Sequence, residues 1–445
     1  MFKRVGVGSM KKVLCLILAA FMCASLCSCA LFSSDTEELI APPQLSGDMS
    51  PIKSALEKSA PKGYSLKYPS AGNRRSAVIL EDINGDGLKE AFAFYSTDGD
   101  ELTKMHINMI AYDNDAWKSV CTAEVTAGGV EKVEFCDIDG DGIKEIAVGW
   151  GIFGSGEKKL AVYKITQKKL VSQLEQPYTS FICCDLNGDS KLDIFVHLLS
   201  SADQSNSAML FAAKDNLVAK IGACLMDKSA KSVLEPKLSV LSTGQAAVYI
   251  DEIKGIGAVT EIIFWQKGEL KNGLLDSAGS GENTMTVRQS SILADDVNDD
   301  GIIEIPVAGP LKNADPESKE IMYYTNWCTY NGEALTVKAC SVVNTVDGYI
   351  VVLPDKLMGK IAVKKDSDLR LREIYSYEPE SDTVREKLFE LLTLKSEKYD
   401  KKEYKGYSVL TKNGGYTYLY KKSAAADSLG LTDSQIRQMF KLYGQ

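Results

Sequence analysis

Residues 137–145 read DIDGDGIKE, and the same pattern recurs three times in the chain. The other copies are DINGDGLKE at 82–90, DLNGDSKLD at 185–193 and DVNDDGIIE at 296–304. Most copies stand between two short apolar runs rich in β-branched and aromatic residues, so the pattern predicts a tight loop that joins two β-strands. One acidic turn of this kind could arise by accident, whereas four in the same register indicate a repeated structural unit.

The polar residues of the pattern have the spacing of calcium ligands. Carboxylates or amides stand at loop positions 1, 3 and 5, and an acid stands at position 9. Alternating side chains in a tight loop can converge on one point, where a hard divalent cation relieves the repulsion among the acids. Calcium binds roughly six to eight oxygens, among them backbone carbonyls, and we assign the carbonyl to position 7. The predicted ligands of Ca²⁺ are Asp82, Asn84, Asp86, Leu88 and Glu90; Asp137, Asp139, Asp141, Ile143 and Glu145; Asp185, Asn187, Asp189, Lys191 and Asp193; and Asp296, Asn298, Asp300, Ile302 and Glu304.

Two further positions define the type of loop. Glycine at position 6 permits the sharp turn because it tolerates a positive φ, and Ser190 in its place makes the third loop the weaker candidate. An EF-hand loop lies between helices and needs a bidentate Glu at position 12. Here position 12 is apolar, and we therefore expect these loops between strands. The residues at position 12 are Ala93, Val148, Val196 and Val307.

The spacing of the loops indicates a modular chain. The first three loops follow one another at similar intervals, and the last interval is about twice as long. The missing copy should lie near residues 240–250. There, residues 247–251 and 260–265 keep the strand–turn–strand outline but lack the acids of positions 1, 3 and 5. We interpret this segment as a degenerate repeat without metal.

Each unit holds four strand-like runs. In the second unit they are residues 130–136, 145–151, 159–165 and 169–174. Four strands in a unit of roughly 40–50 residues are typical of a β-propeller blade. The sequence therefore predicts a mainly β fold with about five to six propeller-like blades over residues 61–345, or an incomplete propeller as the alternative.

The loop core Asp-x-Asn/Asp-Gly-Asp-Gly-x-x-Glu, together with Gly149-Trp150 and residues 298–306, resembles the FG-GAP/VCBS-type repeats of integrin-like propellers and of many bacterial surface proteins. The resemblance covers roughly residues 64–345. The chain is also similar to clostridial-type lipoproteins that carry this repeat. The resemblance implies calcium-stabilised blades and a role in adhesion or ligand binding on the outer face of a single-membrane envelope. It implies no particular chemistry.

The N-terminus has the order of a bacterial lipoprotein signal. Lys11-Lys12 precede the apolar run 13–22, which is too short to span a bilayer as a helix. The segment Leu26-Cys27-Ser28-Cys29 resembles a lipobox, so we expect residues 1–28 to be a signal peptide and Cys29 to receive lipid, palmitate among the acyl chains. This predicts a chain anchored to the cell membrane on its extracellular face. An ordinary signal peptide is the alternative.

Residues 29–60 have the composition of a spacer, with little to bury. A short helix is predicted from Ser50 to Ser59, with Ser50 as its N-cap and Pro51 at the first helical position.

Charge and cysteine content narrow the class of protein. The 445 residues carry a formal net charge of −9, which argues against binding nucleic acid or docking on anionic lipid.

The cysteines beyond Cys29 are odd in number and lie mostly in apolar runs, so we expect small buried hydrophobes rather than a disulfide framework. They are Cys121, Cys136, Cys183, Cys184, Cys224, Cys328 and Cys340.

The pattern changes after residue 345, and residues 346–445 are predicted to form a small α/β domain, or a last blade with helical decoration. Its predicted helices are 383–394, on the helical spacing of its apolar residues, and 433–443, capped by Thr432 with Gln435 at its third position. Strands are expected at 349–353, 360–364 and 371–377. A hairpin is predicted from the strands 407–412 and 416–421 joined by Asn413-Gly414-Gly415.

No catalytic motif stands out in the sequence. The two histidines, His106 and His197, lie in strand-like runs, and we expect both to be structural. The acids that could form a glycosidase pair are committed to the loops, and an acid neutralised by calcium is a poor general acid. We therefore expect a binding or adhesion scaffold for a glycan or an envelope protein rather than an enzyme, with a cell-envelope hydrolase as the alternative.

Overall fold

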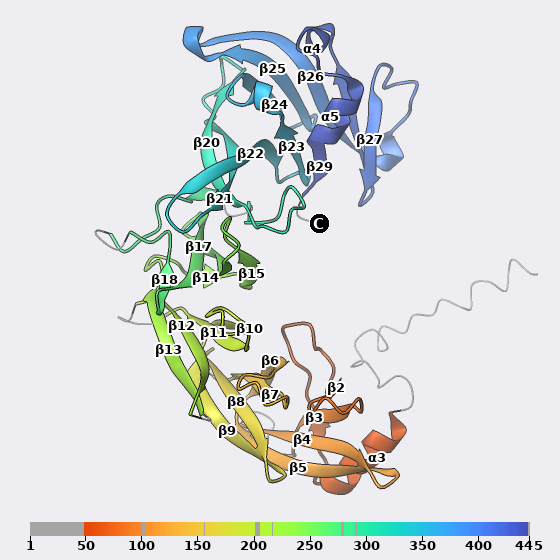
Figure 1. The fold of residues 1–445 in the computed structure, drawn as a ribbon. Helices are drawn as coiled ribbons and strands as arrows, with labels where there is room; N and C mark the ends of the chain where they lie inside the picture. Colours follow the sequence, from red (N-terminus) through yellow and green to blue (C-terminus); the bar gives the residue numbers. More distant parts are fainter. Residues whose placement is uncertain are drawn as a thin grey trace, which may run out of the picture.

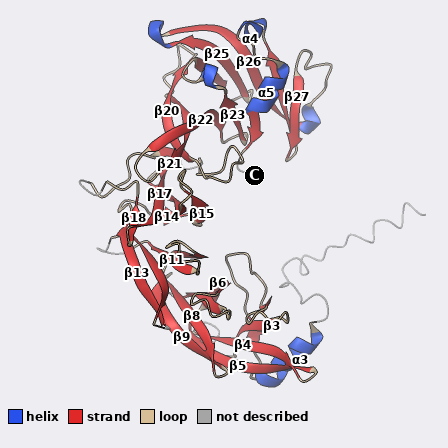
Figure 2. Cartoon of the chain, viewed as in Figure 1, coloured by secondary structure: helices blue, strands red, loops and turns tan. Residues whose placement is uncertain are grey.

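The computed structural model describes residues 49–443 except 100–102, 155, 201–204, 216, 277–279 and 290–291. The signal peptide and Cys29 lie outside the described residues. The protein is mainly β, as the sequence predicts. Figure 1 shows the sheets in chain order along an open curve, with the first and last sheets at its two ends. The few helices lie near these ends (Figure 2).

The first three sheets are antiparallel, and the second and third have the up-and-down order of a propeller blade. The first sheet holds β1 (Ser65–Leu66), β2 (Val78–Glu81), β3 (Glu90–Ser96), β4 (Lys104–Asp113) and β5 (Ala116–Thr126), and α3 (Ser50–Ser59) packs on it. The second holds β6 (Gly129–Cys136), β7 (Glu145–Gly151), β8 (Lys158–Thr166) and β9 (Lys169–Pro177). The third holds β10 (Ser180–Cys184), β11 (Asp193–Leu198), β12 (Ser207–Lys214) and β13 (Leu217–Leu225).

The degenerate repeat forms the fourth sheet, which confirms its strand–turn–strand outline. It holds β14 (Ser232–Val233), β15 (Lys237–Val240), β16 (Ala246–Lys254), β17 (Gly257–Gln266), β18 (Glu269–Asn272) and β19 (Arg288–Gln289). The central hairpin β16–β17 is almost entirely buried.

The last sheet has ten strands and carries two short helices, α4 (Ala424–Ser428) and α5 (Asp433–Met439). Its first part is a four-stranded unit of β20 (Ile305–Asn313), β21 (Met322–Tyr330), β22 (Leu335–Asn344) and β23 (Tyr349–Leu353). Its second part holds β24 (Ile361–Asp366), β25 (Leu371–Glu378), β26 (Thr383–Lys395), β27 (Ser408–Asn413) and β28 (Tyr416–Lys422). The strand β29 (Phe440–Leu442) pairs with β23.

This sheet crosses the predicted domain boundary between residues 345 and 346. The turn there connects β22 to β23, which pair from Asn344 with Tyr349 to Cys340 with Leu353. The two parts of the sheet are joined by the parallel pair β20 and β24. The predicted boundary therefore falls within a hairpin, and the C-terminal residues continue the same sheet.

The helix predicted at 383–394 is wrong, because these residues form the long strand β26. Residues 388–393 are buried without interruption, since the strand is covered on both faces. A continuous apolar run contains helical spacings by chance, so its periodicity does not distinguish a buried strand from a helix. The hairpin β27–β28 and the capping box of Thr432 with Gln435 are confirmed, although α5 ends at Met439 rather than at residue 443.

Neighbouring sheets pack through the two faces of their central strands. Val148 and Trp150 of β7 face the first sheet in one hydrophobic cluster, and Ala147 of the same strand belongs to the cluster shared with the third sheet. A strand with partners on both faces is apolar at successive positions, which explains the continuous runs in the sequence. The seven described cysteines are free, and all are buried or half-buried as predicted.

Candidate metal centres and ligand cavities

The four acidic loops each lead into an interior strand of a sheet, and the first three follow directly after the strand that pairs with it. The first joins β2 to β3, the second β6 to β7 and the third β10 to β11. The fourth leads into β20 and is closed by an isolated bridge between Asp295 and Glu304. Ser190 adopts a φ of 69°, close to the 85° of its counterpart Gly142, so the third loop has the same turn despite its serine.

The acid at position 1 holds the turn of each loop. In the first loop Asp82 accepts the backbone N–H groups of Gly85 at 2.8 Å and Gly87 at 3.0 Å. Both carboxylate oxygens are therefore fixed on the inner side of the turn. The same acceptor role falls to Asp137, Asp185 and Asp296.

The acids at positions 5 and 9 close the loop from its other end. Asp86 accepts the N–H of Leu88 at 2.8 Å, and Glu90 accepts the N–H of Ile83 at 3.1 Å. The residues of position 7 thus lie beside the acids of position 5. Equivalent bonds are accepted by Asp141, Asp189 and Asp300 at position 5 and by Glu145, Asp193 and Glu304 at position 9.

The side chain at position 3 lies between these acids. Asn187 donates to Asp193 at 2.9 Å, and Asn298 donates both to Asp300 at 3.1 Å and to Glu304 at 2.8 Å. Side chains of positions 3, 5 and 9 thus converge, as a ligand shell requires.

In the second loop the convergence involves three acids. Asp137, Asp139 and Glu145 present oxygens that lie within 4.8 Å of one another. Oε1 of Glu145 is buried and makes no hydrogen bond within the described residues. These hard oxygen donors fit a calcium ion. The ammonium group of Lys164 reaches Asp139, Asp141 and Glu145 from β8.

In each loop, the acid at position 9 is the buried one of the predicted calcium ligands. Burial, followed by repulsion from the acids of positions 1 and 5, raises the pKa of Asp193 to about 6 and that of Glu304 to about 7. Burial also raises the pKa of Glu90 and of Glu145. A buried carboxyl beside further acids needs either a proton or a cation.

Consecutive loops touch one another. The backbone N–H of Lys144 in the second loop donates to the carbonyl of Ile83 in the first at 2.8 Å. Nζ of Lys191 in the third loop donates to the carbonyl of Asp139 in the second at 2.7 Å. The first three loops therefore form a row that joins three sheets.

Sequence reasoning missed a buried polar cluster between the third and fourth sheets. Glu252 on β16, Glu261 on β17 and His197 on β11 are all fully buried, and Nε2 of His197 lies 3.0 Å from Oε1 of Glu252. Burial raises the pKa of both glutamates to about 8 and lowers the pKa of His197 to about 4. The sequence signal that could have indicated this cluster is the presence of Glu252 and Glu261 within the otherwise apolar runs of β16 and β17. His106 is also a strand residue, stacked on Tyr95.

A cavity of about 680 Å³ lies between the fourth sheet and the last sheet. Its wall includes Met322, Tyr323 and Tyr324 of β21. Aliphatic side chains on its rim are largely open to solvent. They are Ile256 at 99%, Ile321 at 75% and Val346 at 80% exposure.

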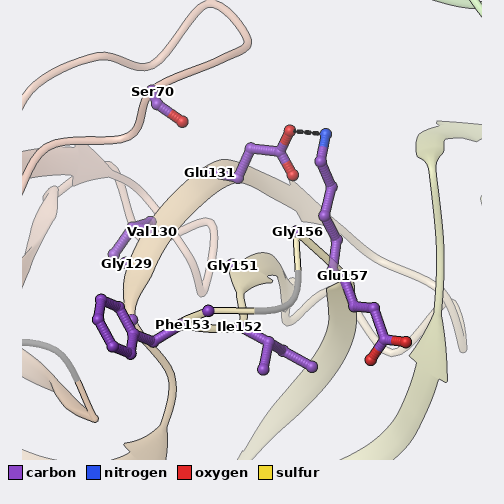
Figure 3. A pocket seen from close by; sticks show the side chains of 12 residues that line it. Ser70, Gly129, Val130, Glu131, Gly151, Ile152, Phe153, Gly156 and Glu157 are labelled. Atoms are coloured by element: carbon purple, nitrogen blue, oxygen red, sulfur yellow. Dashed lines mark hydrogen bonds and ion pairs between the residues drawn. The ribbon is translucent and has the colours of Figure 1, made fainter. Parts of the chain in front are cut away.

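A second, shallower cavity of about 370 Å³ lies at the edge of the second sheet. Figure 3 shows Phe153 on its wall and the pairing of Glu131 with a neighbouring lysine, Lys158. Glu131 also accepts the hydroxyl of Tyr178. Phe153 is 59% exposed.

No family model matches the chain, and no curated protein matches it. Among solved structures, the exotype rhamnogalacturonan lyase YesX is similar at 11% identity and a TM-score of 0.30, over 81% of this chain and 91% of the lyase. The Dos1 propeller is similar at 7% identity and a TM-score of 0.26, over 76% and 81% of the two chains. The exo-β-1,3-galactanase of Phanerochaete chrysosporium is similar at 9% identity and a TM-score of 0.26, over 74% and 79%. At these values the likenesses carry no inference about function.

Proposed function

We propose that this chain is a lipoprotein of the FG-GAP/VCBS type, anchored through Cys29 on the extracellular face of the cell membrane, and that it acts as a calcium-stabilised binding or scaffold module. The observation that carries the proposal is the shared bonding of the four loops. Each turns the acids of positions 1, 5 and 9 toward its own interior, although their repulsion opposes this arrangement.

Calcium would supply the charge that holds these acids together. The side chains of positions 1, 3, 5 and 9 would hold the ion, with the carbonyl of position 7. In the first three loops an ion would tie the start of a central strand to the end of the strand before it, and in the fourth it would hold the bridge between Asp295 and Glu304. Its role is therefore structural.

The cavity between the fourth and last sheets is the best candidate for the ligand site. Ile256, Ile321 and Val346 expose aliphatic surface around it, which monomeric proteins seldom leave uncovered in one place. Aliphatic rims favour an apolar segment of a protein over a sugar, which prefers aromatic faces. We infer a protein partner of the envelope.

Glycan binding is the second candidate, and the cavity in Figure 3 favours it. An exposed phenyl ring beside a carboxylate paired with a lysine offers a stacking face and hydrogen-bond partners for a sugar. The pair Glu252 and Glu261 does not support a hydrolase, because both side chains are fully buried and no substrate could reach them.

The test is a binding screen of the full chain against envelope proteins and glycans. We expect an envelope protein to bind the chain and to lose that binding in the variant Ile321→Ser. The control variant Leu217→Ser, which removes a comparably exposed leucine from β13, should keep the binding. Loss of glycan binding in Phe153→Ser alone would select the glycan instead. Equal binding by all variants would reject both sites.

A further inference from the structure

Among the described residues, only the second loop has a lysine in contact with its acids at positions 3, 5 and 9. Nζ of Lys164 contacts a carboxylate oxygen of Asp139 and lies 2.7 Å from Oδ2 of Asp141. It also lies 3.6 Å from Oε1 of Glu145. The ammonium group therefore stands among three of the acids that would bind calcium.

The strand register explains how the lysine arrives there. Ile146 on β7 pairs with Tyr163 on β8, so the next residue, Lys164, lies opposite Glu145. Glu145 is the position-9 acid of the loop. The side chain of Lys164 is long enough to extend from the strand into the loop, and its side chain is only 21% exposed.

The same place in the other three units is occupied by short side chains. In each of these units, the residue directly after the position-9 acid pairs with a residue on the next strand; the pairs are Ala91–Ile110, Ile194–Phe211 and Ile305–Cys328. Because the strands are antiparallel, the position-9 acid itself lies opposite the residue that follows Ile110, Phe211 or Cys328. These residues are Ala111, Ala212 and Thr329. None carries a charge, so in the described structure only the second loop receives a cation from this position.

Lysine and calcium cannot share this space. An ammonium nitrogen at hydrogen-bond distance from the carboxylates occupies the point from which calcium would bind them at roughly 2.3–2.6 Å. The two cations also repel each other. Calcium could enter only if Lys164 withdrew, which would cost its contacts with the acids.

We propose that Lys164 is a tethered cation that takes the place of calcium in the second loop. Resting on the calcium binding proposed for the repeat, this assigns metal to the first, third and fourth loops and a lysine to the second. The second loop is then closed without metal, and it contacts the first and third loops on either side.

Calcium stoichiometry tests the assignment. Equilibrium dialysis of the full chain should give three ions per chain, and Lys164→Ala should give four. Lys164→Arg keeps the charge and should remain at three. Lys159→Ala is the matched control, because Lys159 lies on the same strand but pairs with Glu175 outside the loop. Four ions in the unaltered chain, or no gain in Lys164→Ala, would overturn the assignment.

A second measurement does not depend on calcium. In EDTA, Lys164→Ala should melt at a lower temperature than Lys159→Ala, because its loop acids have lost the ammonium group that contacts them. Excess calcium should remove the difference. If no variant binds calcium, the proposed calcium function fails, and the melting in EDTA alone decides about Lys164. A lower melting temperature then supports its role as the resident cation, and equal temperatures overturn it.

Discussion

At the residue scale, the most unusual groups are the acids buried away from the loops. Glu261 is surrounded by Glu252 and Asp227, and Glu252 in turn by His197 and by Lys254. Glutamates kept protonated by burial contribute stability that is complete below the pKa of the unfolded chain and is lost as pH rises through their folded pKa. Their neutral state is thus part of the packing between the third and fourth sheets.

This predicts a pH dependence of the melting temperature. Between pH 6.5 and 8.5 the melting temperature should fall, because the pKa of Glu252 and of Glu261, about 8 in the fold, lies above the ordinary 4.5. Below pH 6.5 the lowered pKa of His197, about 4, acts in the opposite direction, since stability is lost as the unfolded chain takes up the proton. The upper range therefore removes the contribution of His197, and Glu304 of the fourth loop, with a pKa of about 7, adds a slope of the same sign.

The measurement is thermal melting across this upper range. Glu261→Gln should flatten the slope because it cannot ionise, and Glu269→Gln should not, since its side chain on β18 is 73% exposed. An unchanged slope in Glu261→Gln would contradict the prediction.

At the element scale, the close approach of the second and third sheets depends on one glycine. A Cβ at Gly149 on β7 would lie 2.0 Å from the hydroxyl oxygen of Tyr178 and 3.3 Å from the ring of Phe181. Both aromatic residues come from the segment that begins the third sheet. The space beside Gly149 is too small for a methyl group, so an added methyl would force either Tyr178 or the strand to move.

Gly149→Ala should therefore destabilise the protein by about 1–3 kcal/mol through overpacking. Gly151→Ala is the matched control on the same strand, because the nearest atom to its added Cβ is a carbonyl oxygen at 4.0 Å. Neither glycine has a positive φ, so backbone strain does not enter the comparison. Urea denaturation of both variants measures the difference, and equal values would show that the sheets adjust freely.

At the scale of the whole molecule, the sheets depend on their neighbours in the chain rather than on ring closure. Successive sheets share hydrophobic clusters, and the first three loops touch one another in a row. Figure 1 shows the two end sheets far apart along the curve. In such a stacked architecture, loosening one unit weakens the contact with the next.

Removal of calcium should therefore lower the melting temperature of the chain. An ion bound only to the folded state stabilises it by about 2.7 kcal/mol per site when its concentration is 100 times the dissociation constant. Calorimetry with and without EDTA measures this, and EDTA presaturated with calcium is the control. Unchanged melting, together with no metal by elemental analysis, would reject structural calcium.

The sequence by itself determined the mainly β fold, the strands of the repeat and the shape of the four loops. These features depend on residues within about ten positions of one another. Their apolar alternation, turn residues and acids can therefore be recognised without knowing which distant segments pack against them. Ser190 shows the strength of this local pattern, because its loop keeps the same turn as the glycine-containing loops.

Only the tertiary structure decided what lies across a strand or between two sheets. The placement of Lys164 opposite Glu145, the burial of Glu252 beside His197 and the strand at 383–395 all depend on pairing or covering by distant residues. Local periodicity cannot specify register or burial on two faces, because both arise from contacts that form only when the chain is assembled.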